Sequence, residues 1–108
     1  MDKEKSKEIC NKIETYLQSK NGLPVPSLED FCISNNYYEQ EIKDNYLLNK
    51  DLRYAVESIK TKAIVILESL LVIETNTIEL QQDGKKVKLD KSGIKMQLRY
   101  LKNYKYTY

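Results

Sequence analysis

Eight basic side chains lie in the last quarter of this sequence, between Lys85 and Lys105, with tyrosines placed among them. Lysine and arginine neutralise phosphate groups, and a tyrosine ring stacks on a base or packs against a sugar. The combination indicates nucleic-acid binding, although a solvated helical face with amphipathic tyrosines shows the same pattern. The basic residues that we expect to contact DNA are Lys85, Lys86, Lys88, Lys91, Lys95, Arg99 and Lys102, and the tyrosines beside them are Tyr100, Tyr104, Tyr106 and Tyr108.

The charges are divided unevenly along the chain. Residues 1–82 carry 10 basic and 14 acidic side chains, whereas residues 83–108 carry 8 basic and 2 acidic ones. The formal net charge of +2 therefore combines an acidic front part with a basic tail. A positively charged tail is suited to bind a polyanion, which agrees with the interpretation that the tail binds nucleic acid.

The sequence lacks the residue types that most enzyme sites need. It has no histidine, the commonest general base and metal ligand, and its three glycines stand too far apart for a phosphate-binding loop. Cys10 and Cys32 lack the spacing of a metal site or a disulfide framework, so we expect two buried thiols in a reducing compartment. We therefore expect no catalytic residues, no metal and no cofactor, and a protein that is not an enzyme.

The elements that hold these residues are organised around one long helix, predicted from about Asn49 to Glu74. Along it, apolar residues recur at alternating steps of four and three, which places them on one face. From Ala63 onward the opposite face is apolar too, and such a helix must be buried on all sides. We therefore predict that its seam joins a second copy of the chain, with the monomer's own core as the alternative. The seam consists of Leu52, Val56, Ile59, Ala63, Ile66, Leu70 and Ile73.

Three shorter helices are predicted before the long one. The first covers residues 2–20 and stops at Asn21-Gly22, because glycine adopts the left-handed conformation without steric cost. Ser27 then caps a short helix, Asn35-Asn36 forms a turn, and another short helix ends at about Tyr46. We expect these side chains to face inward: Ile9, Ile13, Tyr16 and Leu17 in the first helix, Leu28, Phe31 and Cys32 in the second, and Tyr38, Ile42 and Tyr46 in the third.

The two short helices and their tight turn have the layout of a helix-turn-helix unit. If the unit reads DNA, its second helix projects Tyr37, Glu39, Gln40, Glu41 and Lys43 into the major groove. However, residues 27–54 carry six acidic and three basic side chains, and phosphates repel an acidic helix. The unit is therefore either a DNA reader or a helical hairpin that only packs on the long helix.

After the long helix the spacing of apolar residues changes from about 3.6 to about 2. Ile78 and Leu80 alternate with polar residues, Asp83-Gly84 supplies a turn, and Val87 and Leu89 alternate again. An Asp-Gly pair between two alternating segments predicts a β-hairpin.

A last helix is predicted over residues 93–104, with Ile94, Leu98 and Leu101 inward. The fold class is therefore mainly α, with a helix-turn-helix unit, a long central helix, a β-hairpin and a C-terminal helix. We expect one compact domain, in which residues 1–48 form the helix-turn-helix part and residues 49–108 the remainder. The longest apolar run is shorter than the roughly 20 residues that span a bilayer, so we expect no membrane segment.

The order of these parts resembles one protein family. Leu23-Pro24 leads into Ser27-Leu28-Glu29-Asp30-Phe31, and the chain closes on Leu101-Lys102-Asn103-Tyr104-Lys105-Tyr106. From about Ile9 to the end, the sequence resembles the small terminase subunits of tailed bacteriophages. Its ending is similar to the family's usual finish, in which a leucine-lysine-asparagine run on a helix leads into an aromatic-glycine-aromatic tail.

The resemblance implies a non-catalytic protein that forms a ring, binds the packaging site on viral DNA and recruits the large terminase subunit, an ATPase and nuclease. It also implies that Asn36, Tyr37, Gln40 and Lys43 face the DNA and that the long helix makes the ring contacts. Because the recognition helix is acidic, we expect the basic tail to share the contact with double-stranded DNA. The expected location is the cytoplasm, that of the host cell if the protein is viral. The alternative is a small protein-interaction or regulatory module whose helix-turn-helix unit does not bind DNA.

Overall fold

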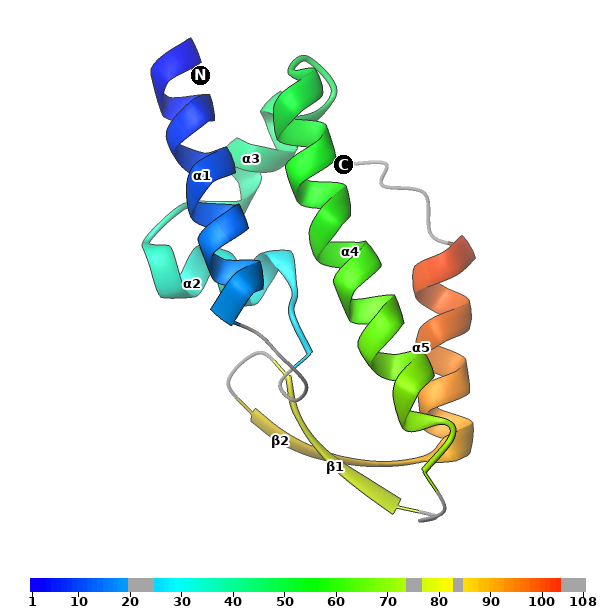
Figure 1. Ribbon diagram of the computed structural model, residues 1–108. Helices are drawn as coiled ribbons and strands as arrows, with labels where there is room; N and C mark the ends of the chain where they lie inside the picture. Colours follow the sequence, from blue (N-terminus) through cyan, green and yellow to red (C-terminus); the bar gives the residue numbers. More distant parts are fainter. Residues whose placement is uncertain (20–24, 74–76, 83–84, 104–108) are drawn as a thin grey trace.

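The computed structural model describes residues 1–19, 25–73, 77–82 and 85–103, and its elements follow in the expected order (Figure 1). The helices are α1 (Lys3–Ser19), α2 (Leu28–Asn35), α3 (Glu39–Tyr46), α4 (Lys50–Leu70) and α5 (Lys91–Asn103), and the strands are β1 (Thr77–Gln82) and β2 (Lys85–Asp90). The fold class expected from the sequence is confirmed. None of the described helices is long and apolar enough to cross a membrane.

Capping residues define where the helices begin and end. Ser27 has an extended backbone, and its Oγ accepts a hydrogen bond of 3.0 Å from the amide of Asp30. Asn36 ends α2 at φ 59° and ψ 41°, the left-handed conformation that asparagine tolerates. Asn49 caps α4, because its Oδ1 accepts a hydrogen bond of 3.0 Å from the amide of Leu52. The predicted cap at Ser27, turn at Asn36 and cap at Asn49 are therefore confirmed.

The first of two hydrophobic cores joins α1, α2 and α3 to the first half of α4. Phe31 is completely buried there, with its ring centroid 5.5 Å from that of Tyr16 and 5.8 Å from that of Tyr37. Large buried rings contribute much of the apolar area that a small core removes from water. The buried members are Ile9, Ile13, Tyr16, Leu28, Phe31, Cys32, Ile42, Tyr46, Leu52, Val56 and Ile59.

The second core joins the other half of α4 to the hairpin, α5 and Val25. The two strands pair antiparallel with Gln82 opposite Lys85, so Ile78 stands opposite Leu89. An isolated hairpin is marginal in water, and here the helices of the same chain support it. The buried members are Val25, Ala63, Ile66, Leu67, Leu70, Ile78, Ile94 and Leu98. α4 belongs to both cores, and its residues Leu52, Val56 and Ile59 pack with the helix-turn-helix part.

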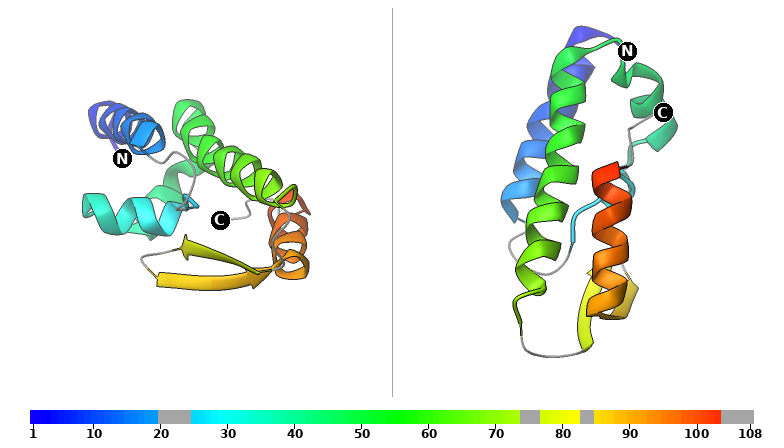
Figure 2. Two further views of the ribbon diagram at one scale, coloured as in Figure 1. Left: turned by 60° about the horizontal axis from the view of Figure 1, so that its bottom comes forward. Right: turned by 90° about the vertical axis from the view of Figure 1, so that its right-hand side faces the viewer.

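The predicted seam of α4 is largely buried by its own chain. Its first six residues belong to the two cores, and α1 and α5 lie against α4 (Figure 2). The prediction that Ile73 belongs to the seam was wrong, because α4 ends at Leu70 and Ile73 lies beyond that end with 41% of its surface exposed. The opposite face was expected to be buried too, but Val65 is 58% and Val72 83% exposed. Burial of the second face is therefore only partial: Leu67 is fully buried, and Ile64 and Leu71 pack against the second core, but Val65 and Val72 are open in the single chain.

Two further boundaries differ from the sequence prediction. Tyr38, expected to face inward, is 82% exposed, because it precedes α3 with an extended backbone and so lies off the helical face. α5 begins at Lys91, two residues before the predicted start, because Asp90 Oδ1 accepts a hydrogen bond of 2.7 Å from the amide of Gly93. The predicted stop at Asn21-Gly22, the Leu23-Pro24 segment and the turn at Asp83-Gly84 lie outside the described residues.

Candidate nucleic-acid interface

α5 carries a stripe of basic side chains beside its buried face. Lys91, Lys95, Arg99 and Lys102 follow one another at steps of four, four and three, so they line one side of the helix. Lys91 is half-buried, and the other three are exposed. Ile94 and Leu98 anchor the adjoining side of the same helix in the second core, which fixes the direction of the stripe.

Only part of this stripe is neutralised by acidic side chains. Lys102 Nζ lies 2.6 Å from Glu68 Oε1 of α4. In contrast, Lys91, Lys95 and Arg99 make no ion pair with any of the residues that the structure describes. An unpaired cation can neutralise a phosphate group and so release the counterions that were condensed on the nucleic acid. The middle of α5 is therefore suited to contact a polyanion.

The hairpin adds three exposed lysines, but its outer face also carries acid. Lys88 stands opposite Glu79 in the strand register, and Lys86 Nζ lies 3.9 Å from Glu79 Oε1. Lys85 stands at the start of β2. Since β2 runs directly into α5, the structure places all seven predicted basic residues on two consecutive elements. Their excess positive charge is greatest on α5.

The expected DNA-facing residues of the helix-turn-helix unit make contacts within the chain. Asn36 serves as the left-handed cap of α2. Tyr37 is half-buried, donates a hydrogen bond of 2.8 Å to Glu8 and lies under Lys12, whose Nζ is 5.3 Å from the ring centroid. This hydrogen bond holds the pKa of Glu8 below its ordinary value, and partial burial raises the pKa of Tyr37. Asn36, through its backbone, and Tyr37, through its side chain, are therefore engaged in contacts that stabilise the fold.

Gln40 and Lys43, the other two candidates, are paired along α3 itself. Gln40 Nε2 donates a hydrogen bond of 2.8 Å to Asp44, and Lys43 Nζ lies 3.2 Å from Glu39. Both contacts join residues four apart on one helix, a spacing that brings side chains together. The single cation of α3 is thus already matched by an acid, and the helix has little attraction for phosphates.

Tyrosine–carboxylate contacts, which the sequence patterns did not reveal, fix this unit to its neighbours. Tyr46 of α3 donates a hydrogen bond of 3.0 Å to Glu57 of α4. Tyr16 of α1 donates one of 2.7 Å to Asp30 of α2. These partners come from different helices, so no spacing rule finds them. The cap at Asp90 was also missed, although an aspartate immediately before a helix is a known start signal.

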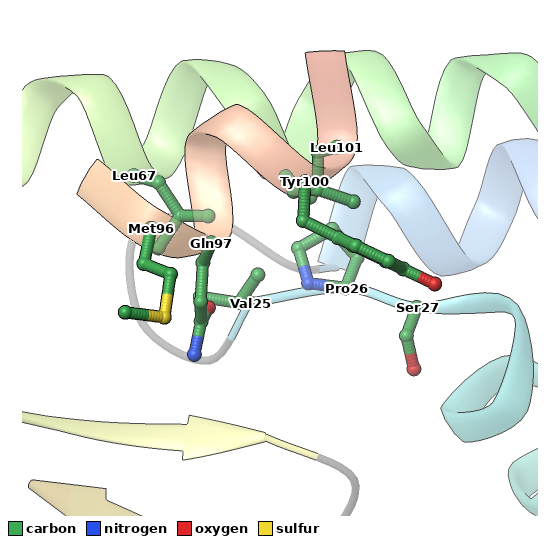
Figure 3. A pocket seen from close by; sticks show the side chains of 9 residues that line it. Val25, Pro26, Ser27, Leu67, Met96, Gln97, Tyr100 and Leu101 are labelled. Carbon is green, nitrogen blue, oxygen red and sulfur yellow. The ribbon is translucent and has the colours of Figure 1, made fainter. Parts of the chain in front are cut away.

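A groove lies beside the basic stripe, between α4, α5 and the segment 25–27, with a volume of about 420 Å³ (Figure 3). Leu67 and Leu101 contribute to its apolar wall, and Tyr100 extends from α5 past Pro26 toward Ser27. None of the described residues that line it is charged. In the described part of the chain, no group of three or more histidine, cysteine or acidic residues is arranged to hold a metal ion.

Comparisons with family models, with curated proteins and with solved structures give no match for this chain. A function therefore has to be argued from the side chains. Two findings bear on it directly: Lys91, Lys95 and Arg99 of α5 are unpaired among the described residues, and the candidate side chains of the helix-turn-helix unit make contacts of their own.

Proposed function

We propose that this protein binds double-stranded DNA through α5 and the adjoining strand β2, as the non-catalytic small subunit of a viral DNA-packaging machine. The observation that carries the DNA-binding part is the row of unpaired cations Lys91, Lys95 and Arg99 on one side of α5. The packaging role, the oligomer and the recruitment of a large ATPase and nuclease subunit come from the resemblance to small terminase subunits.

In this proposal the helix-turn-helix unit is a structural support. Its second helix carries Glu39 and Glu41 in the first turn, and its lysine is paired with Glu39. Close approach to DNA would place these carboxylates against phosphates without releasing counterions, which costs binding free energy. The proposal therefore moves the contact from the four helix-turn-helix candidates to the C-terminal half.

The chemistry of the stripe favours contacts with phosphates over contacts with base edges. Lys91 and Lys102 are eleven residues apart, so the stripe is about 16 Å long at the usual rise of about 1.5 Å per residue. That length follows several phosphates of one strand. Three of the four stripe residues are lysines, which supply point charges, and only Arg99 offers the planar bidentate group that reads base edges. We therefore expect the affinity to depend strongly on salt and weakly on sequence.

The test is a fluorescence-anisotropy titration of a labelled DNA duplex at several salt concentrations. The double variant Lys95→Glu and Arg99→Glu should weaken binding regardless of the duplex sequence. The control Lys3→Glu and Lys7→Glu makes the same change in net charge at exposed positions of α1 and should bind nearly as well. Equal weakening by both variants would mean that overall charge, and not α5, governs binding.

A second candidate function is supported by the groove between α4 and α5. Its lining is uncharged, and Met96 and Tyr100 at its edge are 68% and 61% exposed. Apolar side chains that remain exposed beside a hollow are typical of a surface that binds another protein. If the chain fails to retain DNA even at low salt, a small protein-interaction or regulatory module becomes the better assignment.

A further inference from the structure

Two rows of exposed side chains run next to each other along α5. Lys95 and Arg99 form the basic row, and Met96 and Tyr100, each one residue later, form an uncharged row. Met96 stands three residues before Arg99 and four before Tyr100, and at both spacings side chains are neighbours on a helix. Met96 and Tyr100 are 68% and 61% exposed. A ligand that touches the basic row therefore also reaches the uncharged row.

The uncharged row is at the same time one edge of the groove beside α5 (Figure 3). Gln97 and Leu101 also line this groove, and each comes two residues after a member of the basic row, on the far side of the helix. Around the circumference of α5, Met96 and Tyr100 thus stand between the basic row and the inner wall of the groove. The side chain of Tyr100 extends past Pro26, which is buried.

The groove is suited to an uncharged occupant of the size of a small organic molecule. Its volume of about 420 Å³ lies within the roughly 300–1,000 Å³ of small-ligand sites. None of the described residues that line it is charged. A phosphate inside the groove would lose water without gaining a cation, which costs free energy. At the basic row, in contrast, a phosphate meets cations directly.

We propose that the groove binds an unpaired base of DNA while the adjoining phosphates lie on the basic row. A nucleotide joins an anionic phosphate to a planar, uncharged ring, and α5 presents cations beside an aromatic side chain. Proteins that bind single strands combine these two features, because the cations neutralise phosphates and the bases stack on aromatic rings. In this assignment Tyr100 is the stacking residue, and Met96 packs against the same base.

The charges beside the groove distinguish a nucleotide from a protein segment. A peptide with apolar side chains would fill the groove without using Lys95 and Arg99, which make no ion pair with the described residues. A nucleotide uses both the cations and the groove. Charge complementarity therefore favours DNA over the protein partner that the groove alone would suggest.

This inference rests on the proposed DNA binding and narrows the substrate. In an intact duplex every base is paired and stacked, and removing a base from the stack costs free energy. A base in a single-stranded end or gap is already unpaired, so most of that cost is absent. We therefore expect the chain to prefer a duplex that carries a single-stranded overhang.

Two probes of equal charge test the base site. One is a labelled duplex with a short overhang of thymidines, and the other is the same duplex with an overhang of abasic nucleotides, which keeps the phosphates and lacks the bases. In fluorescence-anisotropy titrations the wild-type chain should bind the base-bearing probe about tenfold more tightly. This ratio should stay nearly constant as the salt concentration rises, because both probes present the same phosphates.

Variants of Tyr100 identify the stacking residue. Tyr100→Ala should bind the two probes equally, whereas Tyr100→Phe keeps the ring and should keep the preference for bases. Tyr38→Ala is the matched control, because Tyr38 is 82% exposed just before α3, and it should also keep the preference. The abasic probe reports on folding, since a misfolded variant would lose affinity for that probe as well.

The two proposals fail at different points of this experiment. Equal affinity of the wild-type chain for the two probes, or a preference that survives in Tyr100→Ala, overturns the base site and leaves duplex binding intact. A chain that retains neither a blunt duplex nor either probe at low salt overturns the proposed DNA binding, and the base site with it.

Discussion

Tyr16 of α1 donates a hydrogen bond of 2.7 Å from its hydroxyl to Oδ2 of Asp30 in α2. The same hydroxyl accepts a hydrogen bond of 3.2 Å from the amide of Ser27, the capping residue of α2. One tyrosine, 6% exposed, thus joins α1 to the start of the helix-turn-helix unit. A phenol is suited to this position because its ring packs in the core while its hydroxyl meets polar groups.

Tyr16→Phe should therefore destabilise the protein by about 1–3 kcal/mol, because it leaves the Ser27 amide and the Asp30 carboxylate without this partner. Urea denaturation followed by circular dichroism measures the change. Tyr38→Phe removes the same hydroxyl from a side chain that is 82% exposed, and its stability should match that of the wild type. Equal midpoints for the two variants would show that the hydroxyl of Tyr16 contributes nothing.

The two faces of α4 should respond differently to loss of side-chain volume. Leu67 is fully buried, so Leu67→Ala should lower the free energy of unfolding by about 2–5 kcal/mol. Val65→Ala, two residues earlier at 58% exposure, should change it by less than about 0.5 kcal/mol in a dilute, monomeric sample. Thermal denaturation of both variants is the measurement, and similar losses would contradict the orientation of α4.

The start of α5 should depend on the side chain of Asp90. Asp90→Ala removes the acceptor for the Gly93 amide and should cost about 0.5–2 kcal/mol. Asp90→Asn keeps an oxygen at the same place and should retain most of the stability, which separates capping from general effects of charge. Urea denaturation checks both variants, and an equal loss in the two would point to charge.

The two cysteines should differ in reactivity. Burial raises the pKa of Cys32 to about 11 from an ordinary value of 9.0, and the side chain is 3% exposed. The folded chain should therefore react with a thiol reagent near pH 8 mainly at Cys10, with Cys32 reacting after unfolding in urea. Mass spectrometry of the labelled chain identifies the site.

The same pKa shift has a consequence for stability at alkaline pH. In the unfolded chain Cys32 ionises near its ordinary pKa of 9.0, whereas in the folded chain it stays protonated to about 11. Its contribution is complete below pH 9.0 and declines as the pH rises toward about 11. Cys32→Ala should flatten this decline in urea midpoints measured across that range; an unchanged decline would exclude Cys32 as its cause.

Single-charge variants should separate the two candidate DNA surfaces. Lys95→Ala removes a cation that is unpaired among the described residues. The negative slope of log affinity against log salt should therefore become shallower by about one. Lys43→Ala removes the cation that α3 pairs with Glu39 and should leave that slope unchanged. Anisotropy titrations measure both, and the reverse result would return the contact to the helix-turn-helix unit.

The sequence by itself determined the elements and much of their inward faces. Ser27, Asn36 and Asn49 act on amides within a few residues, and the inner residues of α4 repeat with the period of a helix. Such signals are local, so they can be recognised without knowledge of the fold. The same applies to the stripe of α5, whose residues share one side of the helix whatever packs against it.

Only the tertiary structure decided what covers each face and which charges remain unpaired. The periodicity of α4 showed two apolar faces, but packing against α1, the hairpin and α5 buried one and left Val65 and Val72 open. Lysines of similar appearance in the sequence also differ: Lys102 meets Glu68 from another helix, whereas Lys95 meets no described acid. The reason is physical, since burial and ion pairing depend on distances between residues far apart in the chain, and the sequence pattern contains no measure of those distances.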